Sequence, residues 1–300
     1  MAKRQLPLGF LVLFWLLWPG TLIADPAILK VPKSQQTEGV SQQYFVGLLQ
    51  MALTEAADGR TVPQIQETAF MEQGRATYEV LRGELIDVFW MGANTEREKS
   101  LRAIKVPLTR GLVGFRRLII HRDRYEQFAQ VETLDDLKAF TACQGLSWPD
   151  TEILRHAGLR VRELAGGNEG LFRAVVAGRC DYYPRGYFEA LSEIARYQPD
   201  YPEIMLLDSL VVHYPFAIYF FVSPENEALA EWIETGLERM IDNDKLLRFM
   251  TEQPLTQMAF PLQSGADWRW FPLVNPLLTD PVIGTQKRYW VQPTDFNGPH

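Results

Sequence analysis

The fold is decided by two stretches of sequence, Leu81-Arg82-Gly83-Glu84-Leu85-Ile86-Asp87-Val88-Phe89-Trp90 and Val176-Ala177-Gly178-Arg179-Cys180-Asp181-Tyr182-Tyr183. Each has the pattern of a helix end, a glycine that closes the helix, and an aspartate that opens a buried strand. Asp181 follows Asp87 by 94 residues, a spacing that favours two similar α/β lobes over a solenoid of short repeats. Two lobes imply a cleft between them, and a cleft is where small ligands bind.

The first 24 residues have the layout of a secretory signal peptide. Lys3 and Arg4 form a short basic region, residues 6–18 are an almost uninterrupted apolar run, and cleavage is expected ahead of Asp25. A retained membrane anchor is the alternative, although the apolar stretch is only marginally as long as the roughly 20 residues needed to span a bilayer. In both cases we expect an exported, periplasmic protein.

Removal of this segment leaves 276 residues, enough for one large domain or two medium ones with real cores. The net charge goes from −7 to −9, because the segment carries two positive charges and no negative ones. Such an acidic chain argues against nucleic acid or an anionic membrane as partner. We expect a monomer that binds a small molecule and needs no cofactor. No metal site is expected either, because the four histidines lie apart from one another and lack partners at ligand spacing.

The chain has two cysteines, Cys143 and Cys180. In an exported protein such a pair suggests a disulfide, which requires Cα atoms within about 7 Å of each other. Two small buried thiols, each in its own strand, are the alternative.

Strands and helices are expected to alternate along the chain, as in an α/β protein. The expected strands span residues 28–31, 64–70, 85–90, 112–121, 139–144, 160–164, 180–183, 204–207 and 216–222. The expected helices span residues 44–56, 74–82, 133–137, 151–157, 169–177, 186–197, 225–241 and 245–251. Residues 92–99 are expected to form a polar loop. The tail after Pro254 has little regular pattern, and two roles are open for it: bracing the first lobe or contacting a partner.

Five motifs occur in a telling order. They are Gly83-Glu84-Leu85-Ile86-Asp87, Thr95-Glu96-Arg97, the strand from Leu112 to Asp123, Thr133-Leu134-Asp135-Asp136-Leu137, and Gly178-Arg179-Cys180-Asp181. Together they resemble the bacterial extracellular solute-binding proteins of family 3, the amino-acid-binding type, although Thr95-Glu96-Arg97 is one residue shorter than that family's T-x-x-R. The resemblance covers roughly residues 28–251. It implies the type II periplasmic binding protein fold, with two Rossmann-like α/β lobes joined by two hinge strands.

The resemblance also implies boundaries for the two lobes. Lobe 1 would comprise residues 25–110 plus 215–300, and lobe 2 would comprise residues 111–214. The chain would cross between the lobes near residues 112–115 and again near residues 212–216. Bending at these crossings would close the lobes around a ligand, as periplasmic binding proteins do.

The first place where a ligand is expected to be held is the loop that carries Thr95 and Arg97. In the resembled family this loop presents an arginine to a substrate carboxylate, which a guanidinium binds through two parallel hydrogen bonds. Because the spacing here is one residue short, a surface position for Arg97 is the alternative.

The second place is the turn from Gln144 to Asp150. Ser147 is expected to cap the following helix with Asp150 as its partner, and the free N–H groups there would form an anion site. An ordinary capping box without a ligand is the alternative. Trp148 would be a stacking wall for an apolar or planar ligand, or a lid packed against the other lobe.

The third place follows the strand of the second repeat, at the end of the sheet where open α/β folds bind ligands. The resembled family usually offers an aspartate there to the ammonium group of its ligand, whereas this chain has Gly186 with Arg185 beside it. We therefore expect Arg185 to bind an anionic ligand, such as a carboxylate or a phosphate ester. Alternatively, Glu189 one turn later replaces the missing acid, and the ligand is amino-acid-like.

Asp87 and Asp181 are not expected to be catalytic, because both stand at strand starts, where they cap or turn the chain. The sequence has no G-x-S-x-G, H-E-x-x-H or phosphate-loop motif. We expect a solute-binding protein, not an enzyme, that delivers its ligand to an inner-membrane ABC transporter permease. One alternative is a periplasmic enzyme similar to cyclohexadienyl dehydratase, with Glu96, Lys99 or Glu189 as acid–base candidates. The other is a ligand-sensing module of a membrane receptor.

Overall fold

The computed structural model describes residues 28–33, 39–263, 268–279 and 286–296. The expected signal peptide, residues 1–24, lies outside the described residues. Within the described ranges, no helix combines the length and the apolar character needed to cross a bilayer.

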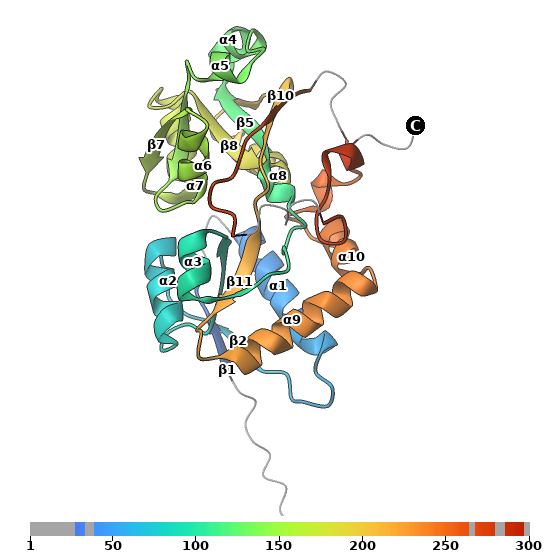
Figure 1. Ribbon diagram of the computed structural model, residues 1–300. Helices are drawn as coiled ribbons and strands as arrows, with labels where there is room; N and C mark the ends of the chain where they lie inside the picture. Colours follow the sequence, from blue (N-terminus) through green and yellow to red (C-terminus); the bar gives the residue numbers. More distant parts are fainter. Residues whose placement is uncertain (1–27, 34–38, 264–267, 280–285, 297–300) are drawn as a thin grey trace, which may run out of the picture.

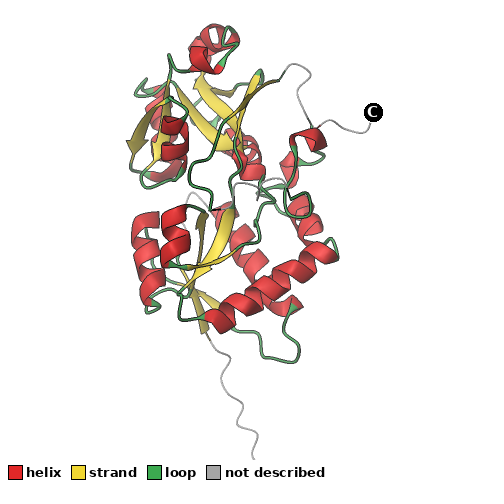
Figure 2. Cartoon of the chain, in the orientation of Figure 1, coloured by secondary structure: helices red, strands yellow, loops and turns green. Residues whose placement is uncertain are grey.

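The chain forms a mixed α/β structure whose sheets fall into two groups at opposite ends of the molecule (Figures 1 and 2). One group is a parallel pair of strands, β1 (Ile28–Val31) and β2 (Gln64–Glu67), and a three-stranded sheet in the order β3-β11-β4. The strands of that sheet are β3 (Val88–Gly92), β11 (Ile218–Val222) and β4 (Arg102–Ile104). The helices around them are α1 (Gly39–Glu55), α2 (Gln73–Arg82), α3 (Thr95–Ser100), α9 (Glu227–Asp242) and α10 (Lys245–Glu252).

The other group is a seven-stranded sheet in the order β12-β10-β5-β8-β6-β7, with β9 also paired to β5. Its strands are β5 (Phe115–His121), β6 (Thr141–Gly145), β7 (Arg160–Leu164), β8 (Tyr182–Gly186), β9 (Ile204–Leu206), β10 (Leu210–His213) and β12 (Arg269–Pro272). Its helices are α4 (Tyr125–Ala129), α5 (Leu134–Leu137), α6 (Asp150–His156), α7 (Gly167–Val176) and α8 (Tyr187–Tyr197). Short 3-10 turns are η2 (Leu112–Gly114), η3 (Arg122–Arg124), η4 (Gln257–Ala259) and η6 (Pro293–Phe296).

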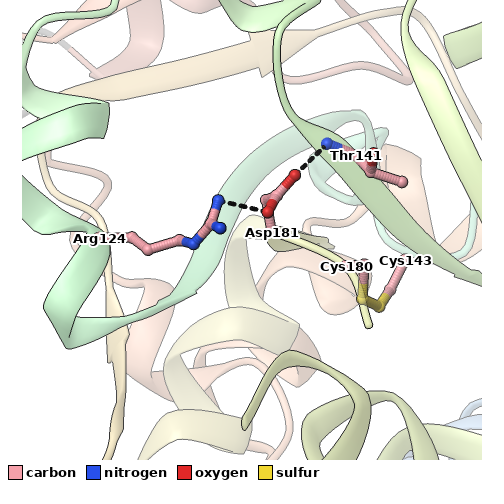
Figure 3. Close-up of a disulfide and its surroundings, with 5 residues drawn as sticks. All are labelled: Arg124, Thr141, Cys143, Cys180 and Asp181. Carbon is pink, nitrogen blue, oxygen red and sulfur yellow. Dashed lines mark hydrogen bonds and ion pairs between the residues drawn. A yellow bond between two sulfur atoms is a disulfide. The ribbon is translucent and has the colours of Figure 1, made fainter. Parts of the chain in front are cut away.

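The two glycine–aspartate stretches have the same structure in both groups. Gly83 ends α2 with φ 64°, and Gly178 follows α7 with φ 65°, a conformation that glycine adopts without strain. Asp87 then exchanges two bonds with Lys30: its side chain accepts from the Lys30 N–H at 2.7 Å, and its own N–H donates to the Lys30 carbonyl at 2.8 Å. Asp181 does the same with Thr141, at 2.7 and 2.8 Å (Figure 3). Both aspartates therefore fasten a strand start to its neighbour, the non-catalytic role that was predicted.

The two cysteines form a disulfide, which resolves the alternative left open by the sequence. Cys143 lies within β6 and Cys180 just before β8, with Cα atoms 5.6 Å apart (Figure 3). Arg124 also forms an ion pair with Asp181 beside it. In the chain-entropy model, a cross-link that spans 37 residues contributes about 4 kcal/mol to stability.

The expected elements are confirmed in order, with differences in short segments. Residues 92–99 were predicted as a polar loop, but they contain α3, whose first turn is capped by Asn94 accepting from the N–H of Arg97 at 2.8 Å. Helix α3 has no apolar stripe, so periodicity does not reveal it. The strands β4 and β10 were not predicted, because each has only three or four residues.

Two chain segments run side by side between the groups of sheets. Strand β10 pairs antiparallel with the start of β5, His213 opposite Phe115, and the N–H of Tyr214 donates to the carbonyl of Gly114 at 3.2 Å. A Cβ on Gly114 would collide with the Tyr214 carbonyl oxygen, so this close approach requires glycine. The paired segments include the two predicted crossings, and the exact lobe boundaries stay a prediction.

The C-terminal tail, residues 254–296, corrects one part of the predicted division. Residues 269–272 fall in lobe 1 by the predicted boundaries, but as β12 they pair in parallel with β10 and extend the sheet of lobe 2. Further along, Trp290 packs on Gly111, and the Val291 N–H donates to the Arg110 carbonyl at 2.8 Å. An apolar strand edge at β10 was available, and the tail covers it.

His213 predicts a pH dependence of stability. It stacks on Phe115 with ring centroids 4.3 Å apart, and burial lowers the pKa of His213 from 6.5 to about 4. As pH falls through this window the unfolded chain takes up the proton first, so stability present above pH 6.5 is lost towards pH 4, by at most about 3 kcal/mol. Urea unfolding at pH 7 and pH 4.5 should show a smaller difference for His213→Gln than for the native protein. Equal differences would contradict this, and the exposed His156→Gln is the control.

Candidate functional site

A cavity of about 390 Å³ lies between the two lobes. Lobe 1 lines it with Phe45 of α1, Trp90 of β3 and Phe216. Lobe 2 lines it with residues of β5, β8 and α8 and with the start of α6. Its volume is within the usual range of small-molecule sites.

The lobe 1 wall of the cavity is aromatic. The rings of Phe45 and Trp90 are stacked with centroids 5.2 Å apart, and the Phe216 ring packs against Gly92 so closely that a Cβ there would collide with it. Strand alternation explains the wall, because residues two apart on one strand share a face. This side can hold an apolar or planar part of a ligand.

The lobe 2 wall carries a chain of buried charges. The Arg185 guanidinium donates to both carboxylate oxygens of Glu193, at 2.9 and 2.6 Å, and forms an ion pair with Glu189 at 3.0 Å. Arg116 donates to Asp150 and lies 3.6 Å from Glu189. The network thus runs from Asp150 through both arginines to Glu193, and its arginine side chains are at most 8% exposed.

Neighbouring polar groups complete this network. The Tyr214 hydroxyl donates to Asp150 at 2.5 Å, and the Asn168 amide donates to Glu193 at 2.8 Å. The ring of Trp148 lies 5.2 Å from the Arg185 guanidinium, in cation–π geometry. These contacts hold the charged side chains in fixed positions.

Burial and charge together set the protonation of three of these groups. Burial by itself lowers the pKa of Arg185, but Glu189 and Glu193 outweigh it, so that the pKa is well above its ordinary value. The pKa of Arg116 is raised for the same reason, with Asp150 as the main opposing charge to its burial. Burial raises the pKa of Tyr214 well above its ordinary value. Both arginines are therefore charged at neutral pH, and Tyr214 is a hydrogen-bond donor.

Three of the seven predicted ligand-binding residues line the cavity: Trp148, Arg185 and Glu189. Gly186 is not among the lining residues; it is the N-cap residue of α8, and its N–H donates to Glu189 at 2.9 Å. The other three, Thr95, Arg97 and Ser147, are also not among the lining residues.

Arg97 connects the two lobes. Its guanidinium donates to the Gly92 carbonyl at 2.6 Å, to Gln73 at 3.1 Å, and across the cleft to the carbonyl of Ser147 at 3.1 Å. The residue is only 5% exposed, and burial lowers the pKa of Arg97 to about 10. Its donors therefore bind neutral oxygens of the protein itself. Thr95 donates to the Leu277 carbonyl at 2.9 Å and so holds the tail.

The predicted capping role of Ser147 is wrong. Helix α6 begins at Asp150 without a side-chain cap, and Ser147 lies in the preceding turn with φ 62°. Asp150, its expected partner, binds Arg116 and Tyr214. The ion pair wins because a buried guanidinium needs a carboxylate more than a helix start needs its cap.

The sequence-based prediction missed Arg116, Glu193 and Tyr214. One signal for Arg116 exists in the sequence, since two arginines interrupt the apolar strand of residues 115–120. A charged residue in a buried strand is rarely without a partner. A signal for Glu193 also exists, because it follows Glu189 by four residues and lies on the same helix face.

No protein-family model and no curated protein matches this chain. Several solved structures do match it. The chain is 16% identical to an ancestral arginine-binding protein bound to arginine, over 76% of this chain and 98% of that one, with a TM-score of 0.55. An ancestral amino-acid-binding protein, a precursor of cyclohexadienyl dehydratase, is 13% identical over 76% and 95%, with a TM-score of 0.56. A histidine kinase sensor domain with similarity to periplasmic binding proteins is 13% identical over 76% and 96%, with a TM-score of 0.57.

The chain has the type II periplasmic binding fold. The solved structures match it over nearly their whole length, which confirms the two-lobed α/β fold predicted from the sequence. At identities of 13–16% the likeness carries the fold and not the ligand.

Proposed function

We propose that this protein captures a small organic solute in the cavity between its lobes. The observation that carries the proposal is the cavity itself, which has an aromatic wall from one lobe and a buried, fixed ionic wall from the other. A pocket at a lobe interface with a few convergent polar groups is the usual architecture of a small-molecule site. Its likeness to an arginine-binding protein and to an ABC transporter substrate-binding protein supports delivery to a membrane transporter.

The apolar N-terminal segment supports export to the periplasm, and so does the disulfide, because disulfides persist in oxidising compartments. A binding role is favoured over catalysis by the state of the cavity carboxylates. Asp150, Glu189 and Glu193 already accept hydrogen bonds or ion pairs from arginines. A catalytic acid or base needs a proton that it can exchange with the substrate.

A thermal-shift screen of the purified protein tests the proposal, using amino acids, amines, dicarboxylates, phosphate esters and short peptides. A ligand at a hundredfold excess over its Kd stabilises by about 2.7 kcal/mol, which raises the Tm by roughly 5–10 °C. Trp148→Leu should reduce the shift, and Tyr78→Leu, on the exposed side of α2, should not. The absence of any shift across the panel would contradict solute binding. Product formation from prephenate or arogenate would make the protein an enzyme.

A ligand-sensing module is the second candidate, supported by the likeness to a histidine kinase sensor domain. The two roles differ in the fate of the N-terminal segment, which a sensor would retain as an anchor. Mass spectrometry of the protein recovered from the exporting cell decides between them: a mature chain that begins at Asp25 favours the transport role.

A further inference from the structure

The buried charges that line the cavity are unequal in number. Arg116 and Arg185 supply two positive charges, while Asp150, Glu189 and Glu193 supply three negative ones. The remaining lining residues with charge, Lys33, Glu72 and Arg196, are solvent-exposed, where water and salt screen them. The ionic wall therefore has a surplus of negative charge where screening is weakest.

Neither cavity arginine is available to a ligand carboxylate. Arg185 is bound by two carboxylates. Arg116 binds Asp150, and its Nε is enclosed by protein atoms. Arg97 does not line the cavity, and it donates to three neutral oxygens of the protein. A ligand anion would have to displace one of these pairs, which would leave a buried carboxylate without its partner.

An acceptor for a ligand cation is present. Both hydrogen bonds that Asp150 accepts, from Arg116 and from Tyr214, end on Oδ1, which leaves Oδ2 for a further donor. Glu189 borders the same cavity between the two arginines. An ammonium group brings three donors and the missing positive charge to such a place.

The opposite wall favours the same class of ligand. The stacked rings of Phe45 and Trp90 face the cavity, and aromatic faces attract organic cations when water is excluded. The rings also offer apolar area to the rest of the molecule.

We propose that the ligand is an organic amine without a required carboxylate: its ammonium group binds Asp150 and Glu189, and its apolar body packs on Phe45 and Trp90. The proposal rests on the proposed function, since it names the solute class of that same cavity. It also replaces the anionic ligand expected from Arg185, because the glutamates of α8 neutralise that arginine.

Calorimetric titration of the purified protein with two matched triplets tests the amine class. The triplets are phenethylamine, phenylalanine and 3-phenylpropionate, and isoamylamine, leucine and 4-methylpentanoate. In each, the amine should bind at least tenfold more tightly than the amino acid, and the acid more weakly still. An acid or amino acid that binds as tightly as its amine would overturn the proposal.

Two variants separate the ionic from the aromatic contribution. Asp150→Asn should weaken amine binding at least tenfold, with its folding checked by circular dichroism. Should this variant not fold, Trp90→Leu leaves the ionic network intact and should weaken amines more than their uncharged alcohol analogues. Equal weakening of both would overturn the cation-binding role of the wall. If neither triplet binds while another solute in the thermal-shift screen does, the amine class fails and the binding function stands. If nothing binds, both fail.

Discussion

Replacing Arg185 by methionine is expected to lower the free energy of unfolding by about 3–5 kcal/mol. The substitution keeps most of the side-chain volume but removes the cation that Glu189 and Glu193 share. Both carboxylates lie on the inner face of α8, and at least one would stay buried without a partner. That is more costly than the loss of a surface ion pair, which contributes less than about 1 kcal/mol.

Urea unfolding followed by circular dichroism measures this effect. Arg196→Met is the matched control, because Arg196 lies on the same helix but is exposed, and its change should stay within about 0.5 kcal/mol. Adding Glu193→Gln to Arg185→Met should restore part of the lost stability, since it removes one of the unpaired charges. A loss below about 1 kcal/mol for Arg185→Met would mean that the carboxylates do not depend on this arginine.

Arg185 also illustrates what the sequence could reveal about the site. Its position was predictable, because it follows the strand of the second repeat and ligands bind at that end of an open α/β sheet. Its state was not predicted, because the ligand-free interpretation of an arginine assumes that it has no partner. The i, i+4 spacing of Glu189 and Glu193 would have supplied one.

The fold was more accessible to prediction than the site because its signals are local. A glycine that ends a helix and an aspartate that fastens the next strand act over a few residues, and both copies are found as expected. The site depends on contacts between distant residues: Arg116 meets Asp150 34 positions away, and Tyr214 meets it from 64 positions away. A local capping rule applied to Ser147 and Asp150 could not anticipate either contact.

Truncating Phe296 to alanine is expected to cost about 3–5 kcal/mol, although the residue is close to the end of the chain. Its side chain is 1% exposed. Ring centroids of Phe115 and Tyr187 lie 4.7 and 5.0 Å from its own, and the rings of Trp268 and Trp270 are within 6.0 Å. Loss of the ring would leave a cavity that these aromatic side chains cannot all collapse to fill.

The position of Phe296 gives the tail a structural role that its irregular sequence does not suggest. Just before it, Arg288 forms ion pairs with Glu238 and Asp242 of α9, both at 2.7 Å, so this stretch is fixed to lobe 1. Phe296 itself packs on Phe115 of β5 and Tyr187 of α8, which belong to lobe 2. The tail therefore spans the lobes beside the paired segments at Gly114 and Tyr214, and its last ring fastens it there.

Thermal and urea unfolding of Phe296→Ala test this role, with Phe70→Ala as the control because Phe70 is 42% exposed and should lose little. Phe296→Leu should lose less than alanine, since it refills part of the volume. The same small loss for Phe296→Ala and Phe70→Ala would show that the end of the tail does not stabilise the fold. A large loss confined to Phe296→Ala would support bracing as the function of the tail, and it would extend that bracing from lobe 1 to both lobes.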